Sequence, residues 1–124
     1  MKAFCFLLSI LCTSCVDLRF DPMEYNNYIS IKDQIVNVNA SCGTSSIIPN
    51  LDKLHTELEH QLDYSSHKKN HSEYTKSISI INNMVIDMQN RYKTNKSVSI
   101  GYCKIKTNDI LVGTNIIIRE IGNL

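Results

Sequence analysis

The sequence predicts a small α+β domain in which an antiparallel β-hairpin packs against two helices, in the order β-α-α-β-β. Between Glu73 and Tyr92, apolar residues recur at intervals of four, three, four, three and four, which places them on one face of a helix. These residues are Tyr74, Ile78, Ile81, Val85, Met88 and Tyr92. The C-terminal segment is instead rich in isoleucine and valine, which are typical of strands. Because an isolated helix is marginal in water, the helical stripe needs an apolar partner, and the hairpin provides one.

The N-terminus has the three parts of a secretory signal peptide. A positive start at Lys2 precedes a short apolar run, and small residues follow up to Cys15. The run is too short to span a membrane, and cleavage fits after Ser14 or after Cys15. We therefore expect residues 1–15 to be a signal peptide and residues 16–124 to form one secreted domain without a membrane span. The alternative is a membrane-anchored lipoprotein with Cys15 as the lipidated residue, although Cys12 stands where a leucine is usual.

The cysteines that remain after such a cleavage are Cys42 and Cys103. An even pair in a small secreted domain predicts one disulfide. The bridge would close a long loop and stabilise the fold by about 4 kcal/mol.

The first half of the domain is predicted from its residue patterns in chain order. Residues 16–27 have no clean period and are expected to form an extended arm. Residues 28–40 alternate as in a strand, with a change of parity after Asp33 and Gln34 that indicates a bulge or a tight turn. After a loop at 41–46, Asn50 is expected to cap a helix from Leu51 to about Tyr64, followed by a polar connector to residue 71 and the helix described above.

The predicted hairpin pairs residues 97–105 with residues 110–121 through a turn at 106–109. Its inner surface would carry Cys103, Ile105, Val112, Ile116 and Ile118, and its outer surface would carry Lys104, Lys106 and Arg119. The exposed edge of such a hairpin would allow homodimerisation. A short-chain helical bundle of the cytokine type is the alternative fold, which the β-branched C-terminus disfavours.

Three sequons mark candidate N-glycosylation sites, at Asn39, Asn70 and Asn95. Their number alone is weak evidence, because about two are expected by chance in a chain of this composition. Asn70 and Asn95 fall in predicted connectors, where a glycan fits, whereas Asn39 lies in the predicted first strand.

The charge balance gives no general basis for binding nucleic acid, because the net charge is only +1 for the 124 residues. We nevertheless expect five basic residues to gather around the end of the second helix and one hairpin face. They are Arg91, Lys93, Lys96, Lys104 and Lys106, a candidate patch for a sulfated glycan or an acidic receptor surface.

No residue set predicts a catalytic, cofactor or metal site. His67 and His71 have helical metal-pair spacing, but they flank two lysines and lack further ligands. We therefore expect a secreted, disulfide-stabilised glycoprotein that binds another protein, such as a receptor or host factor, as an extracellular effector or immunomodulatory ligand. The alternative is a small secreted hydrolase or nuclease-like toxin that uses His67 and His71 as acid and base.

Overall fold

The structure, a computed structural model, describes residues 20–68, 72–94 and 97–124, and within these ranges it contains four α-helices and no strand. The helices are α1 (Pro22–Ala40), α2 (Ile47–Ser66), α3 (Ser72–Thr94) and α4 (Ile100–Gly122). The predicted α+β fold is therefore wrong, and the domain is an all-α bundle. The expected signal peptide, with Cys15, lies outside the described residues.

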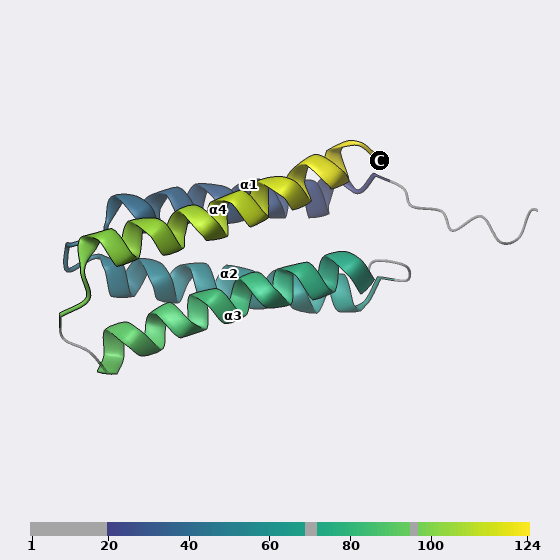
Figure 1. The fold of residues 1–124 in the computed structure, drawn as a ribbon. Helices are drawn as coiled ribbons and strands as arrows, with labels where there is room; N and C mark the ends of the chain where they lie inside the picture. Colours follow the sequence, from purple (N-terminus) through teal and green to yellow (C-terminus); the bar gives the residue numbers. More distant parts are fainter. Residues whose placement is uncertain (1–19, 69–71, 95–96) are drawn as a thin grey trace, which may run out of the picture.

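The helices run alternately in opposite directions and enclose one core. Figure 1 shows α1 and α4 as one antiparallel pair and α2 and α3 as the other, while α1 also packs on α2 and α3 on α4. Each connection between consecutive helices is only a few residues long, so consecutive helices are antiparallel neighbours. This connectivity differs from that of a cytokine bundle, in which long crossover connections link parallel helices. The C-terminus lies at the same end as the start of α1.

One spacing of buried residues recurs in the helices. In α4 the buried positions follow intervals of four, three, four, three and four: Cys103, Thr107, Ile110, Thr114, Ile117 and Ile121. In α2 the same intervals separate Ile47, Leu51, Leu54, Leu58, Gln61 and Ser65. A mean interval near 3.5 keeps these positions facing neighbouring helices that cross at a shallow angle. The stripe predicted between Glu73 and Tyr92 has this spacing too, so the predicted second helix is confirmed within α3.

Two buried threonines explain why the sequence of α4 was misread. The hydroxyl groups of Thr107 and Thr114 donate to the carbonyl oxygens of Cys103 and Ile110, each at 2.9 Å. Because each hydroxyl is satisfied inside its own helix, the threonine methyl groups can occupy core positions. A polar residue at these positions breaks the apolar stripe, and the remaining isoleucines and valines then resemble strands.

The predicted hairpin does not exist in the described residues. Both of its strands, 97–105 and 110–121, and its turn at 106–109 fall within or just before the continuous helix α4. The predicted inner and outer surfaces of the hairpin are therefore also absent from the described residues. The same holds for the strand edge predicted to support a homodimer.

Helix α1 begins at Asp21 and Pro22, which together form a strong start signal. The Asp21 carboxylate accepts hydrogen bonds from the backbone N–H groups of Met23 at 2.9 Å and Glu24 at 3.2 Å. Proline suits the next position because no N–H is needed there. The predicted extended arm and first strand are therefore wrong from residue 22 onward. The segment around Asp33 is helical, so its apolar residues recur at helical spacing. When such a spacing is read with the strand period of two, the parity changes part-way along the segment.

The predicted first helix, from Leu51 to about Tyr64, is confirmed within α2, although its expected cap is not. The helix starts at Ile47, so Asn50 lies inside its first turn. Before it, Gly43 has a φ of 83°, and a Cβ atom there would lie 2.7 Å from Ile100 Cδ1. Glycine is required at this reversal both for its backbone conformation and for space.

Cys42 and Cys103 are joined by a disulfide in the structure, with their Cα atoms 5.8 Å apart. Cys42 follows the end of α1, and Cys103 lies in the first turn of α4, so the bridge fastens these helices at the end of the bundle far from the C-terminus. The bridge closes a loop of 61 residues, for which chain-entropy models give about 4 kcal/mol.

Truncation of two isoleucines in α4 tests whether this segment is a helix or the predicted hairpin. Ile110 is buried and Ile105 is exposed in the structure, whereas the hairpin would place Ile105 on its inner surface. We expect Ile110→Ala to lower the free energy of unfolding by about 2–4 kcal/mol, and Ile105→Ala to change it by less than about 0.5 kcal/mol. Urea denaturation of both variants measures this, and a large loss at Ile105 would contradict the bundle.

Candidate functional site

The predicted basic patch is divided between two sides of α4. Lys104 Nζ donates to the backbone carbonyl of Asn39 on α1 at 2.6 Å. The Arg91 guanidinium instead lies over the ring of Tyr102, 4.0 Å from its centre, where α3 meets α4. Lys104 and Lys106 would lie on the same face only if the segment were a strand. In a helix, residues two apart point in nearly opposite directions. Lys93 is exposed at the end of α3, and Lys96 lies outside the described residues.

The histidines do not form a metal site in the described part of the chain. His67 is exposed, and its Nδ1 donates to the carbonyl of Asp63 at 2.7 Å, while His71 lies outside the described residues. His55 Nδ1 donates to Asn82 Oδ1 at 2.9 Å and so joins α2 to α3. Among the described residues, no group of three or more His, Cys, Asp or Glu side chains is arranged to hold a metal ion.

Of the three candidate glycosylation sites, only Asn39 lies in the described residues. Its Nδ2, the atom to which a glycan is attached, donates to Thr107 Oγ1 at 2.5 Å, and its Oδ1 accepts from Lys104 at 3.1 Å. A glycan at Asn39 would have to displace this contact between α1 and α4. Asn70 and Asn95 lie outside the described residues.

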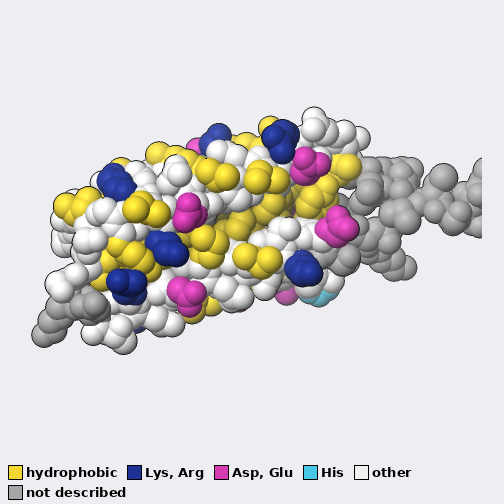
Figure 2. All heavy atoms as spheres, in the orientation of Figure 1, with side chains coloured by type: hydrophobic (Ala, Val, Ile, Leu, Met, Phe, Trp, Pro, Cys, Tyr) yellow, Lys and Arg dark blue, Asp and Glu magenta, His cyan; other side chains and the backbone are white. Residues whose placement is uncertain are grey.

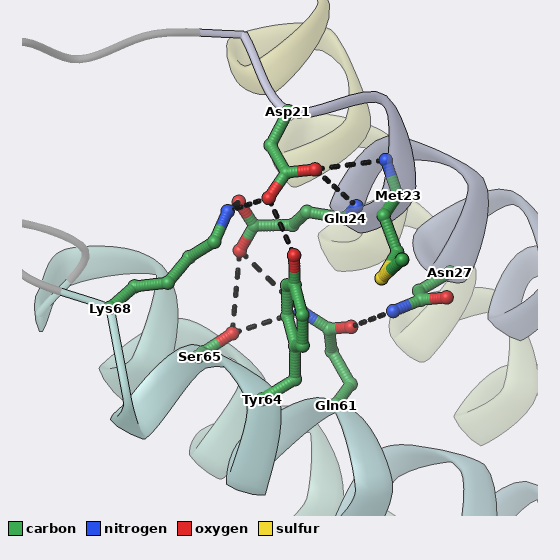
Figure 3. Close-up of polar contacts among 8 residues, drawn as sticks. All are labelled: Asp21, Met23, Glu24, Asn27, Gln61, Tyr64, Ser65 and Lys68. Carbon is green, nitrogen blue, oxygen red and sulfur yellow. Dashed lines mark hydrogen bonds and ion pairs between the residues drawn. The ribbon is translucent and has the colours of Figure 1, made fainter.

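A polar cluster joins the start of α1 to the end of α2 (Figure 3). Glu24 is fully buried and accepts from Ser65 at 3.4 Å and from Gln61 at 3.5 Å. Lys68 lies between the two carboxylates of the cluster: it forms an ion pair with Glu24 at 3.3 Å and another with Asp21. Sequence reasoning missed this cluster, because it treated residues 16–27 and 65–71 as separate loops.

The contacts of this cluster change the pKa of Asp21. Desolvation opposes its charge, but hydrogen bonds from Lys68, Tyr64 and the backbone of Glu24, together with the charge of Lys68, hold the pKa of Asp21 below its ordinary value of 3.8. The Tyr64 hydroxyl donates to Asp21 at 2.7 Å, and this bond raises the pKa of Tyr64.

The contacts of this cluster hold α1 and α2 together. Lys68 is paired with the carboxylates of both Asp21 and Glu24, and Glu24 is fully buried. The hydroxyl of Tyr28 is buried nearby without a hydrogen bond to the described residues, and burial, reinforced by the charge of Glu24, raises the pKa of Tyr28. We therefore interpret the cluster as a clasp between α1 and α2.

A second polar feature is a groove between α1 and α2 that includes Ser30, Glu57 and His60. The Ser30 hydroxyl donates to Glu57 at 3.5 Å, a long hydrogen bond. The groove has a volume of about 240 Å³, below the range typical of ligand pockets, roughly 300–1,000 Å³. It does not provide a substrate site of ordinary size.

The surface that stands out is the outward side of α3 and α4, which we call the α3–α4 face. Large apolar side chains on it are well exposed: Ile80 on α3 (55%), and Ile105 (64%), Val112 (52%) and Ile116 (48%) on α4. Met84, partly buried on α3, lies one turn beyond Ile80. Figure 2 shows apolar side chains spread across this side of the molecule, with acidic and basic side chains among them.

Comparisons of the chain with protein-family models, with curated proteins and with solved structures find no match. None of the described helices is both long and apolar enough to cross a membrane. The α3–α4 face is the candidate functional site, because several large apolar side chains are exposed on it and the packing of the bundle does not use them.

The clasp predicts a specific dependence of stability on pH. The pKa of Asp21 is lower in the folded state than its ordinary value of 3.8. The ionised carboxylate therefore contributes fully to the free energy of unfolding above pH 3.8, and this contribution is lost as the pH falls through the pKa of the folded state. Asp21→Asn keeps an acceptor for the helix cap but removes the charge. We expect it to lower the free energy of unfolding by about 1–2 kcal/mol at pH 7.

Urea denaturation from pH 7 downward measures this difference. The difference in the free energy of unfolding between the wild type and Asp21→Asn should become smaller only below pH 3.8. Asp33→Asn, at an exposed position on the same helix, is the matched control and should show no such gap. Equal stabilities of the wild type and Asp21→Asn at pH 7 would rule out the clasp.

Proposed function

We propose that this protein acts outside the cell that makes it, as a disulfide-bonded helical bundle that binds another polypeptide through the α3–α4 face. The observation that carries this proposal is the row of large apolar side chains on α4 at Ile105, Val112 and Ile116. Contiguous exposed apolar surface with a polar surround is typical of protein interaction sites. Burial of such surface contributes about 25 cal/mol per Å² to association.

The extracellular assignment is supported by two separate features. The first fifteen residues have the pattern of a secretory signal peptide. The bundle also brings Cys42 and Cys103, the two cysteines beyond that segment, into one disulfide, and such bonds persist in oxidising compartments.

The position of the exposed residues favours a binding role over packing within the chain. Ile105, Val112 and Ile116 lie seven and then four residues apart, so they share one side of α4. The opposite side of α4 already supplies the core through Ile110 and Ile117. Helix α4 is thus apolar on two sides, and only one of them is used by the described fold.

Two measurements test the proposal in sequence. When the full chain is produced in a secreting eukaryotic cell, we expect the protein in the medium to lack its signal segment and to carry no free thiol. The labelled product should then bind saturably to intact cells or to the immobilised protein itself. Retention inside the cell with the signal segment and free thiols would contradict the extracellular assignment.

Substitution of the α3–α4 face tests the binding role. Three serines at Ile105, Val112 and Ile116 should weaken saturable binding by at least about tenfold, because each tenfold is only about 1.4 kcal/mol. The matched control replaces Val36 and Ile48, exposed on α1 and α2, with serine and should leave binding unchanged. Equal effects of the two variants, or no saturable binding by the wild type, would refute the role of this face.

A further inference from the structure

The outer stripe of α3 carries a self-complementary order of charges. Its residues follow intervals of three, four, four, three and four, and therefore lie along one line on the helix: Glu73, Lys76, Ile80, Met84, Asp87 and Arg91. In chain order their character is acidic, basic, apolar, apolar, acidic and basic. When the stripe is turned end to end against itself, every charge meets its opposite, and the apolar residues meet at the centre.

We propose that the α3–α4 face binds a second copy of this chain in an antiparallel, two-fold arrangement. Glu73 of one copy then faces Arg91 of the other, and Lys76 faces Asp87. This inference rests on the proposed function, since it names the partner of the same face.

The side chains that would pair between copies are available for it. Glu73, Lys76 and Asp87 are exposed and form no ion pair with any residue in the part of the chain that the structure describes. The spacing would also suit pairs within the helix, Glu73 with Lys76 and Asp87 with Arg91, but the structure forms neither of them. The guanidinium carbon of Arg91 lies 4.0 Å from the centre of the Tyr102 ring, and a cation–π contact leaves the guanidinium N–H groups able to donate.

Opposite charges on α4 are arranged about the same level along the bundle as the charge pairs of α3. The α3 pairs are centred close to residue 82, because Glu73 and Arg91 each lie nine residues from it. At this level Gly113 of α4 approaches Ile81, and a Cβ atom on Gly113 would lie 3.6 Å from Ile81 Cδ1. Lys106 and Glu120 lie seven residues before and after Gly113, so the same rotation places these opposite charges together.

The centre of the proposed interface is apolar. Val112 lies beside Gly113, and Ile105 and Ile116 lie on either side of that level. Glu120 is close to Arg119 of its own helix at 3.6 Å, an exposed pair that can exchange partners at little cost.

The size of the face is sufficient for a stable dimer. Helices of 23 residues are about 34 Å long, and two of them side by side cover roughly 700 Å². A standard protein interface buries about 800 Å² on each partner. In such a dimer the α1–α2 sides face outward, and these helices carry more acidic than basic residues: Asp33, Asp52, Glu57, Glu59 and Asp63 against Lys32 and Lys53.

A charge swap tests this arrangement by sedimentation equilibrium of the full chain as recovered from the medium. Lys76→Asp places two acidic residues opposite each other, and Asp87→Lys does the same with two basic residues, so each should weaken dimerisation by at least about tenfold. The double variant Lys76→Asp/Asp87→Lys restores opposite charges only between antiparallel copies, and its dimer should return to within about threefold of the wild type. Asp33→Lys and Lys53→Asp, exposed on α1 and α2, are the controls and should have no effect.

The outcomes separate this inference from the proposed function. A wild-type chain that is monomeric up to about 200 µM, or a double variant as weak as the single ones, would overturn the antiparallel dimer. If such a monomer still bound cells through Ile105, Val112 and Ile116, the proposed function would stand with a different partner. If the monomeric chain bound no cell through these residues, both the antiparallel dimer and the proposed function would be refuted.

Discussion

The alternation of four- and three-residue intervals between buried positions is the constraint on which this fold depends. It turns one side of each helix toward the bundle axis, and a polar side chain on that side needs a hydrogen-bond partner, which among the described residues only the Tyr28 hydroxyl lacks. Thr107 and Thr114 meet this requirement through their own helix, and Gln61 and Ser65 meet it through Glu24. Because the core is complete in this way, the apolar residues on the outer side of α4 are left for another role.

The two ends of the bundle are fastened by different chemistry. At one end, a disulfide joins the end of α1 to the start of α4. At the other end, the ion pairs of Lys68 with Asp21 and Glu24 join the start of α1 to the end of α2. Helix α1 is therefore held at both ends, whereas α3 and α4 present their outer sides freely.

The sequence predicts helices correctly where an unbroken series of apolar residues at helical spacing marks the buried side, and it fails where that series is interrupted or resembles a strand. Leu51, Leu54 and Leu58 reveal α2, and the stripe from Tyr74 to Tyr92 reveals α3. In α4, Thr107 and Thr114 break the stripe. In α1, the buried residues have helical spacing, but the segment was read with the period of two that is typical of a strand. The error in fold then spread to the candidate site. A period of two placed Lys104 beside Lys106 and turned Ile105, Val112 and Ile116 inward, so the exposed face could not be recognised.

The most direct test of this account is the backbone conformation of Lys106–Asp109, the four residues that distinguish helix from hairpin. Assignment of the backbone by NMR gives 13Cα shifts and nuclear Overhauser contacts for these residues. The bundle predicts helical shifts and contacts between residues three apart, continuous from Ile100 to Gly122. Extended shifts on both sides of a turn, with cross-strand contacts between Ile105 and Val112, would contradict the bundle and the exposed face that depends on it.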